Sequence, residues 1–186
     1  SFEQGTDTPS DWTLSGGNGE WITGAAEGQR AIAVTGSGQS GDSNYWRSQN
    51  LPLAPFGIYQ LRFQARRISG SGGCPISGPV LCNQDLFDLT DSWKPYTSVF
   101  LTPGDPNPED LWLRFGQWEV NGTVAFDAIE LTPAQAVYRT VNGITLGEGE
   151  RLDGSAYTFE APLKDRSANQ SRPLAALNCG FNTGRF

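Results

Sequence analysis

The sequence predicts an all-β protein: a two-sheet antiparallel β-sandwich of the jelly-roll type, with a further β segment at its C-terminus. Apolar and polar residues alternate over short stretches, which is the period of a half-buried strand. Glycine (23 residues) and proline (12 residues) are frequent in the 186-residue chain, and they fall between these stretches. No stretch shows a sustained helical period. Roughly eight to ten short strands at regular spacing are typical of such a sandwich.

The first half of the chain supplies five of the expected strands. They begin at Trp12, Glu20, Arg30, Asn44 and Ile58, and turn sequences such as SGGNG and AAEGQ separate the first three. The strand from Ile58 to Arg67 alternates most regularly. Its apolar set, which includes Leu61 and Phe63, is expected to face a core, and its polar set (Arg62, Gln64 and Arg66) to face outward.

The second half adds a strand around the cysteines, one in DSWKPYTSVFLTP, and two in residues 110–133. The Asn121-Gly122 dipeptide predicts a tight hairpin between the last two, since it supplies the positive φ angles of such a turn. The final strand carries Asp127 between large apolar residues. Burying an unpaired carboxylate costs several kcal/mol, so Asp127 needs a partner. A metal ion, backbone amides, or an arginine such as Arg30 would each satisfy it.

The composition changes after Pro133, which places a jelly-roll domain in residues 1–133. Residues 134–186 are expected to form a linker plus additional strands, because VYRTVNGITL and SAYTFEAPL alternate again. These strands either clamp the sandwich or begin an incomplete second β domain. The abrupt start at Ser1 suggests a mature or excised chain.

Charge and composition exclude several functions. The net charge of -7 argues against nucleic acid and anionic membranes as partners, because both require a basic surface. No apolar run approaches the ~20 residues of a membrane span. Histidine is absent, which removes Ser-His-Asp and Cys-His catalysis and every histidine-ligated metal site. Carboxylate and carbonyl oxygens remain as metal ligands.

The chain has three cysteines, Cys74, Cys82 and Cys179, which are too few and too scattered for a zinc site. A bend near Gly78 would bring Cys74 opposite Cys82. Spacing alone does not fix disulfide geometry, so a Cys74–Cys82 disulfide and two free buried thiols both remain open.

Six short motifs occur in a particular order: SFEQG, Trp12, EGQRAIAVTG, YQLRFQARR, DSWKPYTSVF and GTVAFDAIEL. In this order and spacing, residues 1–133 resemble the jelly-roll carbohydrate-binding modules attached to xylanases and other polysaccharide-degrading enzymes, in the galactose-binding-like group. The resemblance implies a structural calcium ion held by Glu3, Asp127 and the carbonyls of Gly28 and Arg30. Calcium prefers such oxygen ligands, so the chemistry is compatible with this site.

The resemblance also implies a sugar-binding cleft on the concave sheet, where aromatic rings stack on pyranose rings beside fixed hydrogen-bonding groups. The expected saccharide-binding residues are Tyr45 or Trp46, Arg62, Gln64, Arg66, Arg114 and Trp118. Trp118 is expected to be exposed because it breaks register beside Gly116, whereas Trp12, Trp21 and Trp93 are expected in core or edge positions. The arginines suit an acidic saccharide such as a uronic-acid chain.

These observations predict a noncatalytic saccharide-binding module of a secreted, extracellular or periplasmic bacterial protein that acts on polysaccharides. Its expected partners are a polysaccharide and a neighbouring catalytic domain. One alternative is a structural domain that packs on a catalytic neighbour and binds no sugar. Another is a glycoside hydrolase or polysaccharide lyase. Glu119 is the one acid near the expected cleft, whereas a hydrolase needs two, and a lyase would pair Tyr45 with Arg62.

Overall fold

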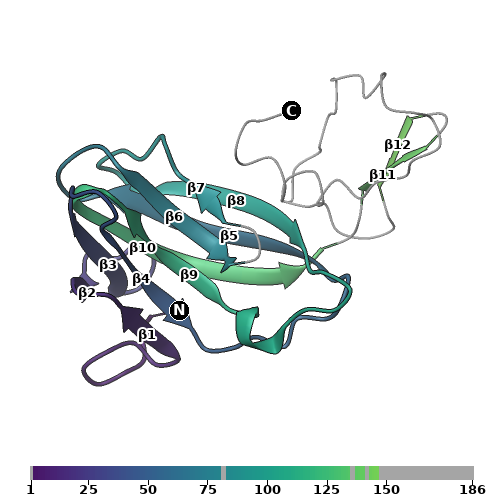
Figure 1. The fold of residues 1–186 in the computed structure, drawn as a ribbon, viewed down its shortest axis with the longest axis horizontal. Helices are drawn as coiled ribbons and strands as arrows, with labels where there is room; N and C mark the ends of the chain where they lie inside the picture. Colours follow the sequence, from purple (N-terminus) through teal and green to yellow (C-terminus); the bar gives the residue numbers. More distant parts are fainter. Residues whose placement is uncertain (1, 81–82, 135–136, 141–142, 147–186) are drawn as a thin grey trace.

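The computed structural model describes residues 2–80, 83–134, 137–140 and 143–146. Two five-stranded antiparallel sheets pack face to face in it, which confirms the predicted sandwich (Figure 1). The first sheet contains, in spatial order, β1 (Trp12–Ser15), β4 (Ser43–Ser48), β9 (Leu113–Trp118), β6 (Cys74–Pro79) and β7 (Gln84–Asp85). The second contains β2 (Gly19–Thr23), β3 (Arg30–Ser37), β10 (Asn121–Pro133), β5 (Ile58–Arg67) and β8 (Lys94–Leu101).

Phenylalanine side chains fill the space between the sheets. Phe63 of β5 meets Phe115 of β9 edge to face, with ring centroids 5.1 Å apart, and Phe126 of β10 lies 5.4 Å from Phe115. All three are almost completely buried. The alternation predicted for β5 is confirmed, because Leu61 and Phe63 lie in the core while Arg62 and Gln64 are half-exposed. Each close aromatic pair adds about 0.5–1.5 kcal/mol beyond the burial of its area.

The predicted hairpin in residues 110–133 is wrong. β9 belongs to the first sheet and β10 to the second, so the chain passes from one sheet to the other between them. Glu119, with φ 54°, provides the positive φ of the connection. Gly122 instead permits a close approach, since a Cβ there would lie 2.3 Å from the carbonyl oxygen of Ser69. Two strands paired in one hairpin and two strands in facing sheets show the same alternation of apolar and polar residues. The sequence pattern therefore does not distinguish a hairpin from a connection between sheets.

A β-bulge interrupts β10 beside the acid singled out above. Asp127 pairs with Gln64, and the next pair in register is Glu130 with Arg62, so two residues of β10 lie opposite one residue of β5. One of them, Ala128, has φ 51°. Bulges of this kind bend the strand and change the direction of nearby side chains.

A short pair of strands follows Pro133. β11 (Val137–Thr140) and β12 (Gly143–Leu146) pair antiparallel, as expected for the VYRTVNGITL stretch. The strand expected in SAYTFEAPL lies outside the described residues, and the domain boundary at Pro133 stays a prediction. A 3-10 turn, η2 (Pro108–Asp110), lies before β9. No helix in the described part of the chain is long and apolar enough to cross a bilayer.

Candidate functional site

A hollow of about 330 Å³ lies on the outer face of the first sheet. Strands β4, β9, β6 and β7 and the residues before β7 line it. The lining side chains are Ser43, Tyr45, Cys74, Ile76, Asn83, Asp85, Arg114 and Trp118. Three of the residues expected to bind saccharide, Tyr45, Arg114 and Trp118, are therefore brought together here.

A glycine keeps the floor of this hollow open. Gly116 of β9 pairs with Tyr45 on one side and Ile76 on the other. A Cβ at Gly116 would lie 2.3 Å from the Cβ of Tyr45 and 2.3 Å from the carbonyl oxygen of Asn44. Because the central strand has no side chain at this point, Tyr45 and Ile76 form opposite walls of the hollow.

Trp118 offers an open aromatic surface. It lies between Ser43 and Cys74 in the register of the sheet and is 49% exposed. Among the described residues, no aromatic ring or cation is in contact with its indole. The expectation that Trp118 is exposed is therefore confirmed, and the ring is available for stacking.

Tyr45 is less available than Trp118. Its ring stacks on Trp112, with centroids 5.9 Å apart and planes at 13°. The guanidinium of Arg47 lies 4.3 Å from the centroid of the Trp112 ring, and that of Arg114 lies 5.9 Å from the Tyr45 centroid. Cation–π contacts of this kind hold a ring in place. Tyr45 is thus a fixed wall of the hollow with one face already covered.

Arg114 is linked to Asp85 through Asn83 within the hollow. Its Nε donates to Oδ1 of Asn83 at 3.2 Å, and Nδ2 of Asn83 donates to Oδ1 of Asp85 at 2.8 Å. Burial lowers the pKa of Arg114, while the charges of Tyr45 and Asp85 act in the opposite direction. The hollow therefore holds one oriented cation with a nearby carboxylate, and both retain hydrogen-bonding capacity.

Cys74 is a free cysteine in the structure, and the Cys74–Cys82 disulfide and the two free thiols both stay predictions. Cys82 lies outside the described residues. Burial, and then the charge of Asp85, raise the pKa of the Cys74 thiol to about 11. The thiol is therefore protonated at neutral pH and is a poor nucleophile.

Trp46 is not a surface residue, which corrects one of the expectations. It is 2% exposed, and its Nε1 donates to the carbonyl oxygen of Ala33 at 3.0 Å. Adjacent residues of a strand face opposite sides, so only one of Tyr45 and Trp46 can reach the outer face. Tyr45 is that residue.

Arg62, Gln64 and Arg66 do not belong to this hollow, which corrects a second expectation. They lie on β5 of the second sheet, whose outer face is on the other side of the molecule (Figure 1). Arg66 donates to the carbonyl oxygen of Gly24 at 3.2 Å and lies over the ring of Trp93. The lyase arrangement of Tyr45 with Arg62 is therefore not assembled. The alternation identifies outward positions but does not tell which sheet carries them.

The expected calcium site centres on residues 26–30. Oδ2 of Asp127 accepts hydrogen bonds from the amides of Ala26 (2.7 Å) and Glu27 (2.9 Å). Oε1 of Glu3 accepts from the amides of Gln29 (3.1 Å) and Arg30 (3.0 Å). The two acids thus hold one loop from two sides, and the amide-capping alternative for Asp127 is realised.

Arg30 does not pair with Asp127, because its Nη1 donates to the carbonyl oxygen of Trp21 at 3.3 Å and its guanidinium lies over that ring. Asp127 is 2% exposed, and no described residue donates to its Oδ1. A Cβ on Gly28 would lie 2.6 Å from Oε1 of Glu3, so this backbone is close to that carboxylate. Carboxylates are ligands that calcium prefers, but the loop presents amide N–H groups to both of them, so a calcium ion at this site stays a prediction. No group of three acids is present among the described residues, so carbonyls and water would complete the shell.

Sequence reasoning missed two polar residues of the hollow, Asn83 and Asp85, and the Trp112 ring that stacks on Tyr45. Asn83 precedes a two-residue strand and Asp85 ends it, and this strand is too short to show a period. Trp112 precedes β9 and is 7% exposed. Trp112 and Arg114 are two residues apart, so alternation places them on the same face. The stacking of Trp112 on Tyr45 joins two segments far apart in the sequence, and no sequence pattern indicates it.

No family model matches the sequence, and no curated protein matches it. Solved structures do. The xylan-binding domain CBM22-1 of Paenibacillus barcinonensis Xyn10C is 14% identical with a TM-score of 0.51, over 72% of this chain and 90% of that one. A cyclase from Fischerella sp. TAU in complex with 4-(1H-indol-3-yl)butan-2-one is 20% identical with a TM-score of 0.52, over 68% and 86%. The arabinose-bound α-L-arabinofuranosidase MgGH51 is 15% identical with a TM-score of 0.52, over 78% of this chain and 25% of the enzyme. These likenesses confirm the resemblance to carbohydrate-binding modules at the level of the fold.

Proposed function

We propose that the chain is a noncatalytic saccharide-binding module whose ligand occupies the hollow on the first sheet. The observation that carries this proposal is the half-exposed ring of Trp118 beside a hollow containing Arg114, Asn83 and Asp85. Sugars need both elements: an aromatic surface for the apolar face of the ring and oriented polar groups for its hydroxyls.

The expected affinity is modest. The hollow is open, and Trp118 is the one tryptophan among its described lining residues. Its polar groups come from a few side chains. Such a site leaves little net free energy after the ligand is immobilised, so dissociation constants from micromolar to millimolar are expected.

The charges in the hollow favour a neutral saccharide. Arg114 donates to Asn83, which in turn donates to Asp85, so an incoming carboxylate would also meet the repulsion of the Asp85 carboxylate in the same hollow. The acidic saccharide expected from Arg62, Gln64 and Arg66 would have to bind the outer face of the second sheet. The binding experiment below therefore includes a uronic-acid polymer as a separate ligand.

Binding is a better fit than catalysis. Asp85 is the one carboxylate among the described residues that line the hollow, whereas a glycoside hydrolase needs two facing its cleft. Glu119, the acid considered above, accepts a hydrogen bond from the amide of Gly41 at 2.7 Å and does not line the hollow.

The larger context is also part of the proposal. A xylan-binding domain shares this fold, and an arabinofuranosidase aligns with this chain over a quarter of its own length. We infer that this module belongs to a secreted or extracellular bacterial protein with a neighbouring polysaccharide-active catalytic domain. Calcium bound between Glu3, Asp127 and the carbonyls of Gly28 and Arg30 would stabilise the loop at residues 26–30. The metal would supply a structural link and take no part in ligand binding.

A panel of immobilised polysaccharides tests the proposal. Xylan, cellulose, arabinan and polygalacturonate are offered to the wild type, to Trp118→Ala and to Arg62→Gln, each with and without EDTA. Retention of the wild type and of Arg62→Gln on a neutral polymer, with loss in Trp118→Ala, supports the hollow as the site. Retention on polygalacturonate that depends on Arg62 would move the site to the second sheet. Product release from any polymer would show an enzyme, and no retention at all would support the purely structural role.

A further inference from the structure

Phe87 is an exposed aromatic residue that the site described above does not use. It is 78% exposed, more than any other large apolar side chain in the described part of the chain. Leaving such a ring in water forgoes about 1.5–3 kcal/mol of burial. Phe87 does not line the hollow, but it lies two residues after Asp85, which does.

The register of β6 and β7 places Phe87 opposite Cys74. Ile76 pairs with Asp85 in the antiparallel ladder. The amide of Leu86 then donates to the carbonyl oxygen of Pro75 at 2.9 Å, which continues the same register by one residue. The next positions along the two chains are Cys74 and Phe87.

Trp118 completes a row across the sheet. It pairs with Cys74. The β6–β7 pairs end at Ile76 with Asp85, and continuing their register past the Leu86–Pro75 hydrogen bond brings Phe87 next to Cys74 in the same row. Asp85 lines the hollow and Leu86 is buried in the core, so by alternation Phe87 faces the same side as Asp85. Two strand spacings separate Phe87 from Trp118, or about 10 Å.

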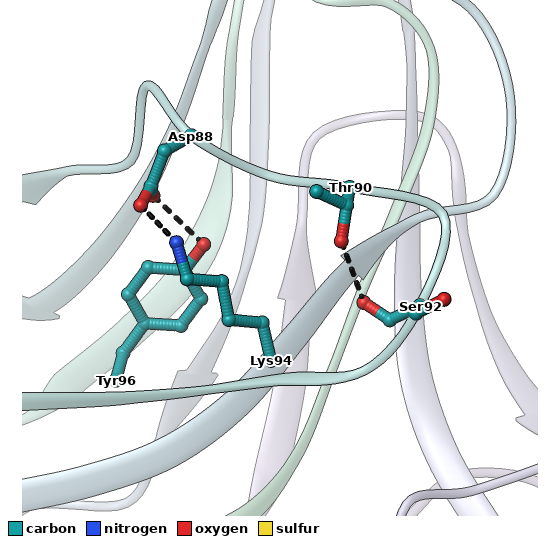
Figure 2. Close-up of polar contacts among 5 residues, drawn as sticks. All are labelled: Asp88, Thr90, Ser92, Lys94 and Tyr96. Carbon is teal, nitrogen blue, oxygen red and sulfur yellow. Dashed lines mark hydrogen bonds and ion pairs between the residues drawn. The ribbon is translucent and has the colours of Figure 1, made fainter.

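The backbone on both sides of Phe87 is fixed. Leu86 is 2% exposed in the core. Asp88 accepts from Nζ of Lys94 and from the hydroxyl of Tyr96 (2.9 Å), both on β8, as Figure 2 shows. An exposed ring on a fixed backbone loses little further conformational entropy when a ligand binds.

We propose that Phe87 is a second stacking platform of the site, so that Trp118 and Phe87 contact two different rings of one saccharide chain. This inference rests on the proposed function. The separation of the two platforms exceeds one pyranose ring, so the ligand is a chain of several sugar units and not a single sugar. The chain runs across the strands of the first sheet, over Cys74.

Calorimetric titration with saccharides of increasing length tests this inference. The probes are xylose and cellulose oligosaccharides from the disaccharide to the hexasaccharide, titrated into the wild type, Phe87→Ala and Phe87→Trp. Phe56→Ala is the matched control, because Phe56 is similarly exposed (71%) but lies in the turn before β5, off this row. Thermal unfolding confirms that each variant is folded.

In the wild type, in Phe56→Ala and in Phe87→Trp, the affinity should rise with length. In Phe87→Ala this rise should be lost, with the hexasaccharide bound roughly tenfold more weakly. If Phe87→Ala follows the wild type while Trp118→Ala loses binding, the second platform is wrong and the proposed function stands. If the wild type binds no hexasaccharide, both are wrong.

Discussion

The side-chain Nε2 of Gln117 donates to Oδ1 of Asn44 at 3.0 Å, and both residues are buried. Oε1 of Gln117 accepts the amide of Val120 at 2.8 Å, and Nδ2 of Asn44 donates to the carbonyl oxygen of Thr35 at 3.0 Å. This network joins β9 and β4 of the first sheet to β3 of the second, directly behind Trp118. Buried polar networks of this kind are stable when every member is satisfied and costly when one is removed.

Replacing Gln117 by alanine should therefore lower the free energy of unfolding by about 2–4 kcal/mol, since it opens a cavity and leaves Oδ1 of Asn44 and the Val120 amide without partners. Urea denaturation measures the change. Gln64→Ala is the control, because Gln64 is half-exposed on β5 and its replacement should cost no more than about 0.5 kcal/mol. Equal losses in the two variants would contradict this role for the network.

Gly116→Ala should close the floor of the hollow. Its new methyl group would overlap Tyr45 and the backbone of Asn44, which should cost about 1–3 kcal/mol of stability and weaken saccharide binding. Gly17→Ala is the matched control, because a Cβ there meets nothing within 4 Å. A Gly116→Ala variant that binds the same polymer as strongly as the wild type would show that the ligand does not occupy this hollow.

The Asp88 contact should make stability depend on pH. The hydrogen bond from Lys94, and then that from Tyr96, lower the pKa of Asp88 below 3.8. A carboxylate with a lowered pKa stabilises the fold above its unfolded-state pKa, and this contribution is lost as the pH falls through the folded-state pKa. The Tm difference between wild type and Asp88→Asn should therefore be largest near neutral pH and vanish well below pH 3.8. A difference that does not change with pH would show that the charge of Asp88 contributes nothing.

Asp127 variants separate a calcium ion from amide capping. If calcium is bound, EDTA should lower the Tm of the wild type, added calcium should restore it, and neither Asp127→Ala nor Asp127→Asn should respond. If Asp127 only caps the amides of Ala26 and Glu27, EDTA should have no effect, and Asp127→Asn should be more stable than Asp127→Ala because it retains an acceptor oxygen. Differential scanning calorimetry of the three proteins distinguishes the two cases.

The sequence was sufficient for the sandwich, because period two along β5 and the glycine and proline between strands depend only on local chain geometry. It was not sufficient for the assignment of strands to sheets. Arg62 and Arg114 are outward residues of similar strands, yet pairing places them on opposite faces of the molecule. Pairing is a long-range property, and local alternation carries no information about it.

The same limit explains the errors at single residues. Tyr45 and Trp46 are adjacent, so the position of the core decides which of them reaches the hollow. Phe87 follows a strand of only two residues, and its place on the row of Trp118 depends on a hydrogen bond between Leu86 and Pro75. These relationships became visible only with the three-dimensional register.

Isothermal titration calorimetry of the wild type and Trp118→Ala with one neutral hexasaccharide is the most direct test of saccharide binding in the hollow. Loss of the Trp118 ring should remove one aromatic stack, or about 1–3 kcal/mol, and weaken binding tenfold or more, while the Tm stays within a few degrees of the wild type. Equal affinity of the two proteins for that ligand would contradict binding at this site, and the absence of heat from the wild type at millimolar ligand would contradict saccharide binding altogether.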